Sequence, residues 1–460
     1  MLKKSFKEVA YKSLDDFMYG KSLYPLKLKN GLEIGGGLVL PEINFTLPAM
    51  EVNDETMPKV LKQYEEIIEG VCERAYELKS PGYIAEIEML PPATYNPQWG
   101  IEIVKVVREV MNKYENNHGL KGALRLTPVD IREDPKSAHM WRGEYWDAIM
   151  ELFEEGAKAG SDFLSIESIG GKDIHDEAIM YCDIRKSLFA LGVLGAKDMT
   201  RIWNEIVNIA DRTNTIAAGD TACGFANTAM VLADKGYVPK AFSAIVRVMS
   251  GVRSLIAFEA GAQGPDKDCG YEGVYIKAIT GYPISMEGKS SAVAHLSPVG
   301  NIAACVADVW SNESIQNIKL LGGMAPTVSM EQLIYDCRLM NIATKKGQGE
   351  ILRDLLADSD SKYDPQAYVL RPDVVLRISE EILKEEGHFL RTKKAALATI
   401  KELKEALKEG KVIIEDKEIP WLDRLEKQLN NVVEDEKKFT EEMIEECSVI
   451  SKFDPKKYDL

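Results

Sequence analysis

The chain has 460 residues, of which 45% are hydrophobic and 28% charged. This length suits one domain of about 250–300 residues with additions, or two ordinary domains. The formal net charge of −16 argues against nucleic acid or an anionic membrane as the main partner, because both reward clustered Lys and Arg. The N-terminus lacks the apolar core of a signal peptide, and no stretch approaches the roughly 18 uninterrupted apolar residues of a membrane helix. We therefore expect a cytoplasmic protein with reduced thiols.

Residues 1–80 are predicted to form an extension ahead of the main domain. The segment Leu26–Ile34 alternates around Asn30-Gly31, which indicates a hairpin with a type I′ turn. Residues 54–78 have a helical apolar period.

From residue 81 to 345, short apolar runs alternate with long amphipathic segments, which is typical of parallel βαβ units. We interpret this region as a (β/α)8 barrel of the TIM type. An open doubly wound sheet is the alternative, because the eighth strand is poorly marked. The strands predicted are 83–89, 123–131, 163–169, 215–220, 254–259, 282–286 and 318–321, and the helices include 145–157, 200–210, 226–235, 240–249 and 330–344.

Residues 346–460 are predicted to be a helical C-terminal region rich in Glu and Lys. Ala396, Ile400, Leu403 and Leu407 recur on one helical face. This stripe needs a cover, either the barrel of the same chain or another protein, and we favour the barrel.

Two of the seven cysteines have near-matching surroundings. Cys223 lies in Gly219-Asp220-Thr221-Ala222-Cys223-Gly224, and Cys269 lies in Gly264-Pro265-Asp266-Lys267-Asp268-Cys269-Gly270. Each follows an apolar run and is bracketed by glycine and aspartate, which suggests a thiolate metal site. The other cysteines fall in helical patterns and are interpreted as buried, inert thiols: Cys72, Cys182, Cys305, Cys337 and Cys447.

Glu167 follows another predicted strand, in Ser165-Ile166-Glu167-Ser168. In a parallel βα architecture the carboxyl ends of the strands converge on one mouth. Two thiolates and one carboxylate suit Zn²⁺, and three protein ligands leave a fourth position open for substrate, as in catalytic zinc sites. The sequence therefore predicts a zinc site made by Glu167, Cys223 and Cys269.

These same three segments closely resemble the zinc subunit of methanol:corrinoid methyltransferases, and the length and order of elements match along essentially the whole chain. The resemblance implies a zinc-bearing (β/α)8 barrel in which Glu167, Cys223 and Cys269 bind the metal. It also implies methanol as substrate and a separate corrinoid (cobalamin) protein as partner, whose cob(I)amide accepts the methyl group. Self-association, or a hetero-oligomer with the corrinoid subunit, is expected.

An acid is needed to protonate the departing oxygen, and three residues are weak candidates for it. Asp220 and Asp268 adjoin the cysteine loops, and Glu88 ends the first predicted strand of the barrel. Their alternative roles are helix caps, turn formers or residues that orient the metal ligands.

Two rival interpretations remain open. One is a related corrinoid methyltransferase that uses another methyl donor, and the other is a non-catalytic zinc scaffold for a corrinoid protein.

Other signals carry little weight. Glu287-Gly288-Lys289-Ser290-Ser291 imitates the end of a phosphate-binding loop, but the required earlier glycine is Pro283. Asn44-Phe45-Thr46 and Asn312-Glu313-Ser314 match glycosylation sequons, which have no meaning without secretion. The five histidines are scattered and interpreted as structural, with His295 the one placed to line the mouth.

Overall fold

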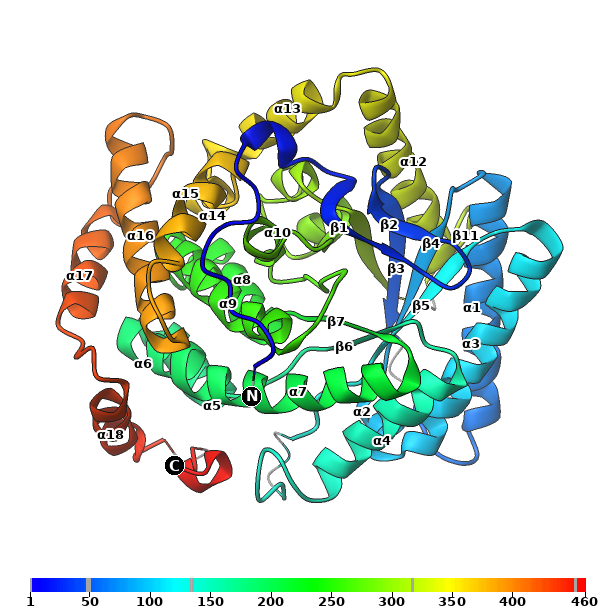
Figure 1. Ribbon diagram of the computed structural model, residues 1–460, viewed down its shortest axis with the longest axis horizontal. Helices are drawn as coiled ribbons and strands as arrows, with labels where there is room; N and C mark the ends of the chain where they lie inside the picture. The colour runs from blue at the N-terminus through cyan, green and yellow to red at the C-terminus, as the bar shows by residue number, and fades with distance from the viewer. Residues whose placement is uncertain (1, 47–50, 133, 135, 316–317, 451–452) are drawn as a thin grey trace.

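The centre of the protein is a curled parallel sheet of seven strands (Figure 1), in a computed structural model that describes residues 2–46, 51–132, 134, 136–315, 318–450 and 453–460. The strand order is β7-β6-β5-β4-β3-β9-β8. The strands are β3 (Leu40–Thr46), β4 (Tyr83–Glu88), β5 (Gly122–Thr127), β6 (Phe163–Ile166), β7 (Ile216–Asp220), β8 (Ser285–Glu287) and β9 (Val309–Ile315). The predicted α/β class with a parallel sheet is confirmed.

An irregular segment, residues 263–266, lies between the two edge strands of this sheet. Gln263 and Gly264 donate backbone hydrogen bonds of 2.8 and 2.9 Å to β7. Asp266 forms a parallel bridge with Ile284, the residue before β8. The segment is therefore bonded to both edges of the sheet.

A ring of helices covers the outside of the sheet, and successive members pack against one another. In order around the ring they are α12 (Ala325–Lys345), α1 (Met57–Glu77), α3 (Pro97–His118), α4 (Glu144–Ala159), α7 (Ala196–Thr213), α9 (Lys240–Ala260) and α10 (Gly273–Thr280). Shorter helices follow individual strands: α2 (Pro91–Tyr95), α5 (Lys172–Tyr181), α6 (Ile184–Phe189), α8 (Thr228–Asp234) and α11 (Lys289–Ala294).

The C-terminal region is helical, as predicted, and lies on one side of the ring (Figure 1). Within it, α16 packs on α9 and α15, so its apolar stripe is covered by the same chain. Ala396, Ile400 and Leu403 are buried there. The helices are α13 (Gly349–Ser361), α14 (Pro365–Tyr368), α15 (Pro372–Ile382), α16 (His388–Lys408), α17 (Ile419–Asn430) and α18 (Glu436–Cys447).

The N-terminal hairpin, β1 (Lys21–Lys27) and β2 (Glu33–Gly36), is confirmed. Its leucines pack on the first inward residues of the sheet, such as Ile84 and Phe163, and so cover the N-terminal end of the sheet. The predicted type I′ turn is wrong. A type I′ turn needs a positive φ at both central residues, but of Asn30 and Gly31 only Gly31 has one, of 78°. The Asn30 side chain is instead bound to the sheet, where its Nδ2 donates to the Gly122 carbonyl at 2.9 Å.

Residues 254–259 are not a strand but the end of α9, and that prediction was wrong. Every residue of α9 after the first is buried, so the helix lacks the exposed polar face by which a surface helix is recognised. A short apolar run in such a helix cannot be told from a buried strand. The helix is also long and apolar enough to cross a bilayer, but its window of 18 residues is 100% buried inside the protein.

Two strands of the sheet, β3 and β9, were not predicted. Strand β3 lies within residues 1–80, so the predicted extension contains the strand between β4 and β9. Residues 318–321 do not supply a strand of this sheet. They contribute to a separate small hairpin, β10 (Lys319–Leu320) with β11 (Gly323–Met324).

Candidate metal centre at the carboxyl end of the sheet

The three predicted ligands meet at the carboxyl end of the sheet. Donor atoms of Glu167, Cys223 and Cys269 all lie within 4.8 Å of one another, and Glu167 Oε1 is 3.4 Å from Cys269 Sγ. Glu167 directly follows β6. Cys223 opens a π-helical turn, η3 (Cys223–Asn227), after β7, and Cys269 lies in the loop before α10. Residues distant in sequence therefore form one cluster.

The chemistry of this donor set fits zinc. Burial and the neighbouring Glu88 raise the pKa of Glu167 to about 7. A hydrogen bond with Cys269 lowers the pKa of the Cys223 thiol, but burial and Glu167 raise it, with a net rise to about 11. Burial and Cys223 raise the pKa of Cys269 well above its usual range. The protein alone therefore disfavours the charged forms, which a divalent cation would stabilise as ligands.

The glycines beside the cysteines allow the two loops to approach closely. A Cβ on Gly219 would lie 2.0 Å from Asp266 Oδ1 and 3.0 Å from the Asp266 Cα. A Cβ on Gly270 would lie 3.2 Å from the Ala222 carbonyl oxygen. Glycine is favoured at both positions, because a side chain there would press on these backbone atoms and displace the side chain of Asp266 or Glu272.

Each cysteine sulfur has a polar side chain beside it. Asn227 Nδ2 donates to Cys223 Sγ at 3.5 Å, one helical turn along η3. Thr221 Oγ1 lies 3.5 Å from Cys269 Sγ.

Lys267 places a positive charge beside the cluster. Its Nζ lies 3.3 Å from Glu167 Oε1 and 2.8 Å from Glu86 Oε1. Burial opposes the charged ammonium, but Glu86, Glu88 and Glu167 together raise the pKa of Lys267 well above its usual range. The ammonium therefore fixes one oxygen of the predicted carboxylate ligand.

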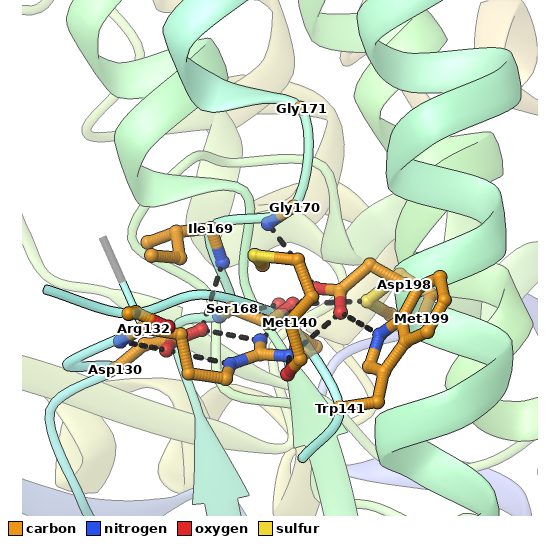
Figure 2. Close-up of polar contacts among 12 residues, drawn as sticks. Asp130, Arg132, Met140, Trp141, Ser168, Ile169, Gly170, Gly171, Asp198 and Met199 are labelled. Carbon is orange, nitrogen blue, oxygen red and sulfur yellow. Dashed lines mark hydrogen bonds and ion pairs between the residues drawn. The ribbon is translucent and has the colours of Figure 1, made fainter. Parts of the chain in front are cut away.

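The loop after Glu167 is anchored by buried charges. Arg132 pairs with Asp130 at 2.5 Å and Asp198 at 2.7 Å, and all three side chains are inaccessible to solvent. The two carboxylates also accept the Ile169 and Gly170 amide hydrogens, each at 3.1 Å. Figure 2 shows this network, which holds the backbone two and three residues beyond the ligand.

Two of the three candidate acids, Asp220 and Asp268, accept hydrogen bonds that support the loops of the site. Asp220 accepts hydrogen bonds from Trp203 Nε1 at 2.9 Å and Arg253 at 3.2 Å, and it is fully buried. The oxygens of Asp268 accept the backbone amides of Glu272 and Gly273 at 3.1 and 2.8 Å, which is a capping role at the start of α10.

Glu88 differs from the two aspartates. Asn44 Nδ2 donates to its Oε2 at 2.9 Å, and its charge raises the pKa of Glu167, one of the predicted ligands. It is therefore the candidate acid whose charge acts on the cluster of predicted ligands.

A second group of donor atoms lies on the β8–β9 side of the sheet end. Atoms of Glu287, His295 and Glu313 are within 4.8 Å of one another. Tyr271 OH donates to Glu287 at 3.4 Å, and His295 Nε2 is 3.6 Å from the same carboxylate. The sequence favoured a structural role for His295, with lining of the mouth as its alternative, whereas Glu287, Glu313, Lys267 and Glu86 were missed.

A signal for some of these residues existed. Glu86 precedes Glu88 by two residues on β4, so both side chains point to the same face. Lys267 lies inside the segment Gly264–Gly270 that contains Cys269. Glu313 had no such signal, because its strand was not predicted.

Comparison with known proteins identifies the family. A profile for MtaB, the methanol-cobalamin methyltransferase B subunit, matches residues 3–459. The chain belongs to the methanol-cobalamin methyltransferase B subunit family. The methanol–corrinoid protein co-methyltransferase of Methanosarcina barkeri (strain Fusaro / DSM 804) is 42% identical over 402 residues, 86% of each chain.

A solved structure agrees with this family membership. One chain in the crystal structure of the methanol:cobalamin methyltransferase complex MtaBC from Methanosarcina barkeri superposes with a TM-score of 0.94 at 38% identity. The match covers 99% of this chain and 100% of that chain. The family resemblance carried by the three sequence segments is thus confirmed.

Proposed function

We propose that this protein takes the methyl group of methanol and transfers it to the corrinoid of a separate partner protein. Family membership along nearly the whole chain supports this activity. The observation in the structure that carries it is the convergence of Glu167, Cys223 and Cys269 donor atoms within 4.8 Å. All three comparisons name methanol, which favours it over another methyl donor.

Glu167, Cys223 and Cys269 would hold Zn²⁺ in this proposal. When bound, the ion would supply the Lewis acidity that the reaction needs, because hydroxide is a poor leaving group from carbon. Lys267, 3.3 Å from Glu167 Oε1, would orient that carboxylate. Asn227, 3.5 Å from Cys223 Sγ, would orient that sulfur.

Among the three candidate acids, Glu88 is the one that we assign to the departing oxygen. Asn44 orients its carboxyl group through Oε2. Asp220 and Asp268 would instead support the ligand loops, since backbone and buried side-chain donors already occupy their carboxylates.

The sheet would close as a (β/α)8 barrel, with residues 263–266 as its eighth, irregular strand. The backbone bonds of this segment to β7 and its bridge beside β8 support the closure. The carboxyl ends would then surround one mouth, through which a corrinoid held by a partner protein reaches the site. A cytoplasmic hetero-oligomer with that corrinoid protein fits this arrangement.

Metal analysis and methyl transfer test the proposal together. Purified protein should contain about one zinc per chain and should methylate free cob(I)alamin with methanol faster than with methylthiols or methylamines. Cys223→Ala and Glu167→Gln should lose both zinc and activity. Folded, zinc-free variants that still transfer methyl groups would overturn the metal assignment. A preference for another donor would overturn the substrate.

A further inference from the structure

The loops that carry the two cysteines are hydrogen-bonded to each other in both directions. Thr221 Oγ1, on the first loop, accepts the Cys269 amide hydrogen at 3.1 Å and the Gly270 amide hydrogen at 3.3 Å. In return, Glu272 Oε1 on the second loop accepts the Ala222 amide hydrogen at 2.6 Å. Each loop therefore supplies a side-chain acceptor for the backbone of the other.

Both acceptors are shielded from solvent. Thr221 is 1% exposed and Glu272 is 0% exposed. Water cannot replace a lost acceptor at such a position, so each removed bond would leave a buried N–H group without its partner. The bonds are consequently strong constraints on the spacing of the loops.

The second loop is in turn fixed to the helix behind it. Ser254 Oγ, on α9, donates to Glu272 Oε1 at 3.0 Å. Arg247 Nη1, also on α9, donates to the Gly270 carbonyl at 2.6 Å. The paired loops therefore rest on a deeply buried helix.

The Thr221 hydroxyl has one further hydrogen-bonding capacity. A hydroxyl can accept two hydrogen bonds and donate one, and the two backbone amides account for the acceptor sites. The hydroxyl hydrogen can then point to Cys269 Sγ, which lies 3.5 Å away. Donation to a thiolate withdraws electron density that the sulfur would otherwise give to a metal.

We propose that Thr221 and Glu272 are positioning residues that clamp the two thiolates at metal-binding separation, with Thr221 also tuning the donor strength of Cys269. The clamp rests on the zinc site proposed above, and it adds two residues to it that contact no metal themselves. Residues that orient metal ligands commonly contribute 10- to 100-fold to metal affinity.

Thr221→Val tests the clamp because it keeps the shape and removes the hydroxyl. We expect Zn²⁺ affinity, measured by competition with a chromophoric chelator, to fall about 10- to 100-fold. In Co²⁺-substituted protein, the sulfur-to-cobalt charge-transfer band should shift in energy. Thr221→Ser retains the hydroxyl and should restore both the affinity and the band.

Glu272 gives a second, independent pair of variants. Glu272→Gln keeps an acceptor oxygen for the Ala222 amide and should hold Zn²⁺ within about twofold of the unmodified protein, whereas Glu272→Met should bind about 10-fold more weakly. This pair decides the matter if Thr221→Val does not fold.

Thr399→Val is the matched control, since Thr399 is equally buried but its hydroxyl bonds Ala395 within α16. It should leave Zn²⁺ affinity and the cobalt band unchanged. The clamp is rejected if Thr221→Val and Glu272→Met bind Zn²⁺ as the unmodified protein does, or if Thr399→Val weakens binding equally. Cys223→Ala separates the two proposals: if it abolishes Zn²⁺ binding while the clamp variants do not weaken it, only the clamp fails.

Discussion

The two sides of the sheet end differ in chemistry and in how firmly they are held. The β6–β7 side carries Glu167 and the two cysteines, and every ligand loop there is tied by buried hydrogen bonds or ion pairs. The β8–β9 side carries Glu287, His295 and Glu313, where Tyr271 OH lies 3.4 Å and His295 Nε2 lies 3.6 Å from the Glu287 carboxylate. Both sulfur donors lie on the first side together with one carboxylate, and we call it the rigid side because of these ties. We call the second side, with two carboxylates and an imidazole, the looser side because the segment around His295, residues 293–296, is largely exposed.

The donors themselves do not differ consistently in exposure, since Cys269 is 6% and Glu287 4% exposed. The surroundings differ, because Val293 and Leu296, close to His295, are 73% and 62% exposed. The metal proposed for Glu167, Cys223 and Cys269 would need fixed ligand loops to keep one geometry during turnover. The looser side carries no sulfur donor, so substitutions on the two sides should have unequal consequences.

The largest difference is expected between Cys269→Ser and Glu313→Gln. The first removes a soft ligand and should lower methyl transfer by on the order of 10⁴-fold, because the Lewis acid contributes several kcal/mol. The second should retain zinc and lose no more than about 10-fold in rate. Zinc content and turnover with free cob(I)alamin measure both. Equal zinc loss in the two variants would show that the comparison is wrong.

The rigid side should also depend on its buried arginine. Arg132→Met leaves Asp130 and Asp198 buried without their cation and should lower the free energy of unfolding by about 3–5 kcal/mol. Arg377→Met is the matched control, since Arg377 also pairs with two carboxylates, Asp373 and Glu402, but is 48% exposed. That change should cost about 0–1 kcal/mol. Urea unfolding compares them, and similar losses would remove the distinction between buried support and surface pairing.

The sequence predicted the rigid side far better than the looser one. Glu167, Cys223 and Cys269 are chemically distinctive residues that follow apolar strands, so both the strand pattern and the ligand types were visible. The alternation of Glu86 and Glu88 on β4 was equally readable, although only Glu88 was selected.

Strand β9 of the looser side and its neighbour β3 were missed because they carry polar side chains where a barrel interior is expected to be apolar. Asn44 on β3 and Glu313 on β9 pair in register. In the sequence, each belongs to a glycosylation sequon and to no predicted strand. Strands that line a site lose the hydrophobic pattern by which strands are predicted. The strand predicted at 254–259 failed for a different reason, since α9 is buried on every side and has no exposed polar face to mark it as a helix.

Lys267 lies beside Glu167, so the effect of Lys267 on stability should depend on whether Zn²⁺ is bound. Lys267→Met removes the ammonium beside Glu86 and Glu167 and should destabilise the metal-free protein by about 2–3 kcal/mol, because the carboxylates lose their buried partner. Zinc would compensate the same negative charge, so the gain in stability on adding Zn²⁺ should be larger in the variant than in the unmodified protein. Thermal unfolding with and without Zn²⁺ measures this gain.

Lys277→Met provides the control for this prediction. Lys277 is also buried and pairs with Asp308 at 2.9 Å, but it lies on α10 and contacts none of the three ligands. Its variant should be destabilised without any change in the gain from Zn²⁺. If the gain in stability from Zn²⁺ is equal in both variants, the Lys267 ammonium and the metal do not neutralise the same carboxylates.

The smallest effect is expected from Glu287 on the looser side, and it should depend on pH. Burial and Glu313 raise the pKa of Glu287 well above its ordinary value of 4.5. The folded protein therefore keeps this carboxyl protonated at pH values where the unfolded chain ionises it, so its contribution to stability is full below about pH 4.5 and declines as the pH rises. Glu287→Gln cannot ionise. In metal-free protein its stability relative to the unmodified chain should increase with pH, by about 1 kcal/mol or more at pH 8.

Urea unfolding at pH 4.5 and pH 8 checks this prediction, with the exposed Glu380→Gln as control. The control should show no such pH-dependent gain. A Glu287→Gln variant whose relative stability stays constant across this range would mean that Glu287 is ionised in the folded protein. The looser side would then need a compensating cation, and the contrast between a metal-binding side and a proton-holding side would no longer stand.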